Sequence, residues 1–170
     1  MKQIIKIAGL LMFCVCVAFA SLYVNMCNAN TREIHELILQ EKTKYDDLQI
    51  LSEVVIGENL YYAFSTPVSD GIAEFHRQKN GSYKWWSHAW ISKGGVLGDT
   101  AFVNRDYYRL YLYNNDEAVS LKVRIEFNDG STTIDEYDVS ENKLVYFKTN
   151  DANKIELKYY DKNGKEIWYE

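Results

Sequence analysis

Apolar and polar residues alternate strictly in the second half of the chain. In residues 120–127 (SLKVRIEF), Leu, Val, Ile and Phe occupy every second position, with Ser, Lys, Arg and Glu between them. Successive side chains of a strand point to opposite faces, so this pattern predicts a half-buried strand with one wet face. Short runs rich in β-branched and aromatic residues recur from about residue 49 onward, separated by turn residues. The chain after residue 48 is therefore predicted to be mainly β.

Turn residues predict how these strands connect. Asn80-Gly81 lies between two strand-like runs and favours a type I′ hairpin turn. A two-residue loop there places Ala73 opposite His88 and Phe75 opposite Trp86, all on one face of the hairpin. No helical pattern separates the later strands, which favours antiparallel sheets or small sandwiches over βαβ units.

A long apolar run precedes the strands. Residues 7–24 (IAGLLMFCVCVAFASLYV) contain no charge, and Lys2 and Lys6 are the only charged residues before Arg32. As a helix this run spans roughly 27 Å, which is just enough to cross a bilayer. The two lysines predict a single-pass membrane protein with its N-terminus in the cytoplasm and its body outside. A cleaved signal peptide and secretion remain the alternative, although the length of the run favours an uncleaved anchor.

The patterns divide the chain into five stretches. In chain order these are a signal peptide or membrane anchor (1–30), a helix and linker (31–48), a front β-meander (49–93), a Gly-rich linker (94–99) and a back β-sandwich-like region (100–170). The helix is indicated by Ile34, Leu37 and Ile38, which share one face. Whether the two β regions form one domain or two stays open.

Composition and charge narrow the function. The chain has 170 residues, with 19 basic and 24 acidic residues and a formal net charge of −5. It has no basic block, and nucleic-acid affinity rests on neutralising phosphates, so no nucleic-acid partner is expected. All three cysteines precede residue 28. The body therefore has no disulfide, no thiolate nucleophile and no cysteine-based zinc site.

The sequence contains no recognised catalytic or cofactor motif. Nucleophile-elbow, zinc-protease, P-loop and dinucleotide-binding signatures are all missing from it. His35 lies on the expected helix, and the hairpin places His76 and His88 on opposite faces, so no shared metal site is predicted. The carboxylates mostly occupy turns or adjacent strand positions that point to opposite faces. We therefore expect no catalytic residue, no metal, no cofactor and no enzymatic activity.

Aromatic residues are the unusual feature of the body. They make up 15% of the chain and fill adjacent strand positions, so some of them must face solvent or a partner. We expect Trp85, Trp86 and Trp90 to form a contact face for a protein or a glycan. An anchor followed by a β-rich body predicts a non-catalytic interaction module of the bacterial envelope, with an envelope protein as partner.

Two alternatives to this function stay open. The first is a glycan-binding or cell-wall-binding module that uses a Trp/Tyr platform. The second is a carboxylate-dependent hydrolase, which requires two acidic side chains that converge in a cleft.

The strand and turn sequences also carry a resemblance. The stretches 123–131 (VRIEFNDGS), 144–149 (LVYFKT) and 154–167 (KIELKYYDKNGKEI) resemble uncharacterised exported, membrane-anchored small β-rich proteins of Gram-positive, Bacillus-like bacteria. The resemblance extends over most of residues 50–170 and rests on strand and turn patterns. It implies an exported location and a β-rich architecture, and it assigns no functional residue.

Overall fold

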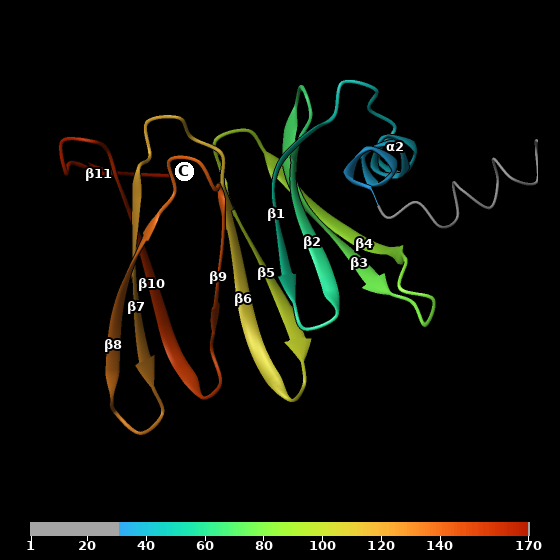
Figure 1. Ribbon diagram of the computed structural model, residues 1–170. Coiled ribbons are helices and arrows are strands. Elements are labelled where there is room, and N and C mark those ends of the chain that lie inside the picture. Colours follow the sequence, from blue (N-terminus) through green and yellow to red (C-terminus); the bar gives the residue numbers. More distant parts are fainter. Residues whose placement is uncertain (1–30, 170) are drawn as a thin grey trace, which may run out of the picture.

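The computed structural model describes residues 31–169 and shows a mainly β protein built from antiparallel sheets (Figure 1). The apolar run 7–24 lies outside the described residues, so its predicted role as a membrane or signal helix remains a prediction. Within residues 31–169, no helix is both long enough and apolar enough to span a membrane.

The first part of the described chain is a helix packed on a four-stranded meander. Helix α2 (Arg32–Thr43) confirms the predicted helix, and it precedes a sheet with the order β1-β2-β3-β4. The strands of this front sheet are β1 (Gln49–Ile56), β2 (Asn59–Ser65), β3 (Ser69–Arg77) and β4 (Tyr83–Ser92). Leu39 of α2 is fully buried against this sheet, so the helix is part of the fold and not a free spacer.

Strand β2 explains why the front sheet is covered on both faces. Its sequence NLYYAFS is apolar at nearly every position, and six of its seven residues are buried. Leu60 and Tyr62 pack toward α2, whereas Tyr61 and Ala63 pack on the opposite side of the sheet. An unbroken apolar strand is typical of a sheet that is buried on both faces.

Two further sheets complete the molecule. The central sheet has the order β5-β6-β9, and the outer sheet has the order β11-β10-β7-β8. The central strands are β5 (Val96–Val103), β6 (Asp106–Tyr113) and β9 (Leu144–Lys148). The outer strands are β7 (Ser120–Phe127), β8 (Thr132–Asp138), β10 (Ala152–Tyr160) and β11 (Glu166–Ile167).

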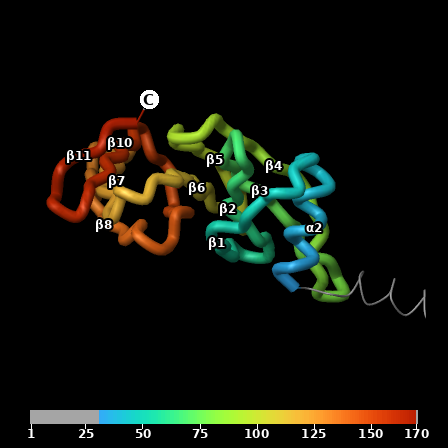
Figure 2. The backbone as a smooth tube through the Cα atoms, turned by 90° about the horizontal axis from the view of Figure 1, so that it is seen from above, coloured from blue at the N-terminus to red at the C-terminus, as the bar shows by residue number. Residues whose placement is uncertain are grey.

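The central sheet lies between the other two. Leu110 and Leu112 of β6 pack toward the front sheet, while Tyr113 and Phe147 pack with β7 and β10 of the outer sheet. The view in Figure 2 shows the resulting order of layers, from α2 through the front and central sheets to the outer sheet. The central sheet therefore packs against the front sheet on one face and against the outer sheet on the other.

The stretch 94–99 differs from the expected Gly-rich linker. Only Lys93 to Gly95 form a turn, and β5 begins at Val96. Gly94 has φ +83, which suits the tight turn. Gly98 and Asp99 are paired with Tyr111 and Leu110 of β6. The glycines thus mark a short connection into an edge strand and not a boundary between two units.

The hairpin at Asn80-Gly81 also differs from its predicted register. Gln78 N donates to Ser82 O at 2.7 Å, and of the loop residues only Gly81 has a positive φ. The loop therefore has three residues rather than two, because a type I′ turn needs positive φ at both central positions. This shifts the register by one residue, so that Phe75 pairs with Trp85 and not with Trp86.

A β-bulge restores the predicted register farther along the hairpin. Ser87 pairs with Glu74 and Trp85 pairs with Phe75, so Trp86 is the extra residue without a ladder partner. Beyond the bulge, Ala73 pairs with His88 as predicted.

Candidate functional site

The three tryptophans that we expected to share one face lie in three different environments. Trp85 is half-buried in the core beneath α2, with Lys42 Nζ 5.5 Å from its ring centroid. Trp86 is 62% exposed and stacks on His76, which lies on the opposite face of the sheet from α2. Trp90 is 51% exposed and contacts His88 instead. The bulge at Trp86 separates it from the other two tryptophans.

Strand β4 is the last strand of the front sheet. It has ten residues and pairs with β3 alone, so among the described residues its outer edge has no strand partner. Such an edge presents unpaired backbone N–H and C=O groups that can pair with another chain. Exposed lysines such as Lys84 at an edge also limit uncontrolled pairing.

A hollow of about 580 Å³ lies at the C-terminal end of β4, and we call it the Trp90 groove. Its lining comes from three parts of the chain: the loop after α2, the β2–β3 turn and the end of β4. The lining residues are Tyr45, Val68, Ser69, Trp90, Ile91 and Ser92. Val68 and Trp90 are both more than half exposed, so the hollow is apolar and open. Three consecutive β4 residues line it, so it follows the edge of the strand.

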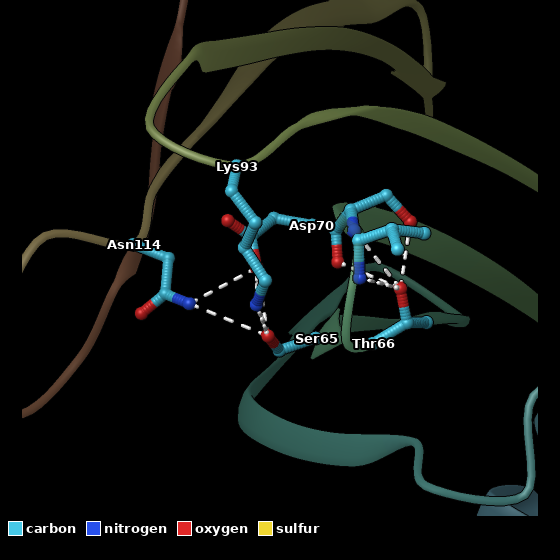
Figure 3. Close-up of polar contacts among 7 residues, drawn as sticks. Ser65, Thr66, Asp70, Lys93 and Asn114 are labelled. Carbon is cyan, nitrogen blue, oxygen red and sulfur yellow. Dashed lines mark hydrogen bonds and ion pairs between the residues drawn. The ribbon is translucent and has the colours of Figure 1, made fainter.

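A buried polar cluster lies beside the groove (Figure 3). Asp70 is only 1% exposed, and its Oδ1 accepts from Ser65 Oγ at 2.8 Å, Lys93 Nζ at 2.9 Å and Asn114 Nδ2 at 3.0 Å. Ser65 and Asp70 flank the β2–β3 turn, Lys93 begins the turn into β5, and Asn114 follows β6. One carboxylate thus ties three chain segments together next to Ser69 and Ser92.

The cluster also places a serine hydroxyl next to a lysine, because Lys93 Nζ donates to Ser65 Oγ. A serine nucleophile needs a base that can accept its proton. Here the carboxylate of Asp70 keeps Lys93 in a charge-assisted pair, and Ser65 donates to the same carboxylate. Ser65 is also buried. The geometry is therefore that of a structural tether.

A second polar assembly holds Trp86 in place from behind. Glu74 Oε1 accepts from Asn59 Nδ2 at 3.1 Å and Tyr61 hydroxyl at 2.9 Å, and it lies 2.8 Å from His76 Nε2. The His76 ring in turn stacks on Trp86, with ring centroids 4.6 Å apart and an interplanar angle of 12°. One face of the indole is thereby covered by His76, while Trp86 as a whole remains 62% exposed. We call Glu74, His76 and Trp86 the Trp86 platform.

The carboxylates of Asp99 and Glu74 interact electrostatically between the front and central sheets. Asp99 lies on the same face of β5 as Leu97 and Ala101, which pack toward the front sheet. Burial raises the pKa of Asp99, and the nearby carboxylate of Glu74 raises it further. Because four side chains already hold Glu74 as an acceptor, this pair has the character of a packed polar contact.

The histidines are distributed over separate sites. His35 is buried beneath α2 with its Nδ1 2.8 Å from the Tyr62 hydroxyl, and burial lowers the pKa of both His35 and His88. His76 lies on the opposite face of the sheet from His88, as predicted. Within residues 31–169, no group of three or more His, Cys, Asp or Glu side chains could hold a metal ion.

The hairpin that carries the tryptophans is basic although the chain is acidic. Between Glu74 and Asp99 the sequence contains Arg77, Lys79, Lys84 and Lys93 and no acidic residue. Lys93 pairs with Asp70, whereas the other three make no ion pair with any of the described residues. The edge of β4 and its turns are therefore a local positive strip.

Comparison with protein-family models, curated proteins and solved structures found no match to this chain. The resemblance to exported Gram-positive proteins therefore remains a prediction, and the site must be understood from its own geometry.

Sequence reasoning singled out Trp90 but missed its partners in the groove, Tyr45 and Val68, and missed the Asp70–Lys93 pair. Tyr45 is 45 positions before Trp90 in the chain, and no periodic pattern joins them. The sequence offers one usable signal for this part of the site. Asp70-Gly71 and a Thr-Pro turn lie between two apolar strands, and this combination marks a tight hairpin.

Proposed function

We propose that this protein is a non-catalytic interaction module that binds an extended segment of a partner protein along the edge of β4. The observation that carries the proposal is the Trp90 groove beside a ten-residue strand whose outer edge is unpaired. In strand addition, backbone hydrogen bonds supply affinity and side-chain pockets supply specificity. The groove is the side-chain pocket, and the β4 edge is the backbone template.

The chemistry of the groove defines the partner segment. Trp90 and Val68 offer apolar surface, and Ser69 and Ser92 add polar residues to the lining. An aromatic anchor in a half-open pocket is typical of energetically important interface residues. The segment therefore carries a large apolar side chain, flanked by residues that favour the extended conformation.

The proposed location is the outer face of the cell membrane, with residues 7–24 as an uncleaved anchor. The uncharged run and its two N-terminal lysines support this location. The partner is then an envelope protein with an extended segment within reach of the membrane.

Selection from a displayed peptide library tests the peptide-binding function. The full-length protein in detergent is the target, and its Trp90→Ala variant is the counter-target. We expect peptides that bind the parent and lose at least about tenfold in affinity, or about 1.4 kcal/mol, with Trp90→Ala. Phe102→Ala is the matched control, because Phe102 is an exposed aromatic residue at 59% on another sheet.

A chemical variant of the selected peptide tests strand addition itself. Methylation of alternate backbone nitrogens removes ladder hydrogen bonds and leaves the side chains in place. One alternating set should abolish binding and the other should be tolerated. If both sets bind equally, or if Trp90→Ala retains every selected peptide, strand addition at β4 is refuted.

A further inference from the structure

We infer that the Trp86 platform is a second, independent binding site, and that its ligand is a neutral pyranose ring of a glycan. This site lies on the face of the front sheet opposite α2, whereas Trp90 points to the α2 side. The inference therefore goes beyond the proposed peptide site and does not depend on it.

The first argument is that the indole is pre-positioned. Trp86 is the bulge residue, and bulges re-aim a side chain out of the normal alternation. His76 covers one indole face, and Glu74 orients His76. Asn59 and Tyr61 in turn hold Glu74. A large side chain that is already immobilised loses little conformational entropy when a ligand binds.

The second argument is that polar residues flank Trp86 on its own strand. Its neighbours on that face are Lys84, which pairs with His76 in the ladder, and Ser87, which contacts Glu74. Protein interfaces usually need a contiguous apolar patch around an aromatic anchor. A pyranose ring instead needs one flat aromatic face for its C–H groups and polar groups for its hydroxyls. The C–H groups carry partial positive charge and pack on the negative face of the indole.

The third argument concerns charge and selects a neutral sugar. Lys84, the ladder partner of His76, supplies a cation on this face, and Glu74, which contacts His76, supplies a carboxylate. One of these groups attracts a charged ligand and the other repels it, so their effects offset one another. A sugar hydroxyl, in contrast, can hydrogen-bond to either group. Glu74 Oε2 has a single contact, from Ser87 Oγ at 3.4 Å, so it keeps capacity to accept from a sugar hydroxyl.

Titration of the full-length protein with defined oligosaccharides tests this site. The probes are the hexasaccharides of β-1,4-linked glucose, N-acetylglucosamine and mannose, with a galacturonic acid hexasaccharide as the anionic contrast. The readout is the NMR signal of the Trp86 indole N–H, assigned by its loss in Trp86→Phe. We expect millimolar binding of at least one neutral hexasaccharide and a shift of that signal.

Variants of one strand separate this site from the Trp90 groove. Trp86→Ala should weaken the sugar at least about tenfold, while Trp86→Tyr should retain most of the affinity because it keeps an aromatic face. Trp90→Ala should leave the affinity for the sugar unchanged. Because Trp86 is exposed, its substitution should not unfold the protein.

Three results overturn the inference. They are no binding of any neutral hexasaccharide, equal affinity of the parent and Trp86→Ala for the sugar, and binding of the galacturonic acid hexasaccharide alone.

Discussion

Asp70 shows how a single residue can hold several parts of this molecule in register. It is buried, its Oδ1 accepts from three side chains, and its Oδ2 is buried without a hydrogen-bond partner among the described residues. A buried carboxylate without its cation is costly, so Lys93 sets the stability of the whole cluster. Because Ser69 and Ser92 line the Trp90 groove, the same cluster also sets the shape of the proposed peptide site.

Removal of the cation tests the role of this cluster. Lys93→Met leaves Asp70 buried and unpaired, so we expect the free energy of unfolding to fall by about 3 kcal/mol. Denaturant unfolding followed by fluorescence measures the change. The matched control is Lys148→Met, because Lys148 pairs at 2.8 Å with Asp106 on the surface. Exposed pairs contribute little to stability, and equal losses in the two variants would contradict a structural role for the cluster.

The raised pKa of Asp99 predicts that this residue lowers the stability of the protein at neutral pH. Its pKa is raised by burial and then by Glu74, so the folded state holds its proton more tightly than the unfolded state. Stability is therefore lost as the pH rises from the ordinary aspartate pKa of about 3.9 through the folded value. Asp99→Asn should raise Tm at pH 7 by about 2 °C, which corresponds to roughly 1 kcal/mol or less in a domain of this size.

The pH dependence and a control separate this effect from a change in packing. The gain with Asp99→Asn should vanish below about pH 4, where the carboxyl is protonated in both states. Asp106→Asn is the control, because hydrogen bonding to Lys148 lowers the pKa of Asp106. That variant should destabilise at pH 7. A gain with Asp99→Asn that persists unchanged at low pH would show that charge is not its cause.

At the scale of elements, α2 is bound to the front sheet by apolar contacts and one buried histidine. Leu39 is fully buried, and the His35 ring lies 4.6 Å from Phe75 and hydrogen-bonds Tyr62. His35 Nε2 is buried without a partner among the described residues. A second ring proton, which makes the imidazole cationic, would therefore bury an uncompensated charge beneath the helix.

Acid should therefore weaken the attachment of α2. Burial lowers the pKa of His35, so stability is lost as the pH falls below the unfolded histidine value of about 6.5. His35→Phe should flatten the pH dependence of unfolding between pH 7 and 5, by at most about 1.4 kcal/mol per pH unit. His88, which burial shifts in the same direction, accounts for a remaining slope.

A non-titrating variant distinguishes the proton from the packing. Ile38→Val also lies in α2 and packs at the margin of the same core, but it removes no ionisable group. It should lower stability equally at all pH values. A pH slope that is identical in the parent and in His35→Phe would contradict the account of α2.

Elements with a regular alternation of apolar and polar residues could be predicted from the sequence, whereas the glycine-containing strand β5 could not. Strand β7 (Ser120–Phe127) has the predicted bounds, because its period of two is unbroken. Strand β5 was missed because its glycines suggested a linker. Gly98 instead lies in the strand beside the Tyr111 ring, where a Cβ would come within 3.1 Å of Tyr111 Cε1. Turn residues also misled: Asn104 and Arg105, not Asn80 and Gly81, form the two-residue loop with positive φ at both positions.

The candidate site was less predictable than the fold because it depends on tertiary placement. The bulge at Trp86 accompanies a three-residue loop, and neither feature can be deduced from Asn80-Gly81 alone. The bulge places Trp86 and Trp90 on opposite faces. Residues from three segments line the Trp90 groove, and only the packing of those segments brings them together.

At the scale of the whole molecule, the order of layers in the described chain leaves the outer edge of the front sheet, at β4, free to bind a partner. The central sheet is covered on both faces, and the front sheet is covered by α2 and the central sheet (Figures 1 and 2). The long edge of β4 is not covered by another strand of the described chain. The proposed peptide site lies at this edge of β4, and the proposed glycan site lies on the face of the same strand opposite α2.

The most direct test of the central claim is photo-cross-linking of the full-length protein in the cells that produce it. A photoreactive phenylalanine derivative replaces Trp90 in one strain and Phe102 in another, since both positions are exposed. If the β4 edge binds an envelope protein, position 90 should give a discrete cross-linked species that position 102 does not give. Mass spectrometry should then map the partner peptide to an extended segment. Cross-links from position 102 but none from position 90 would contradict the account.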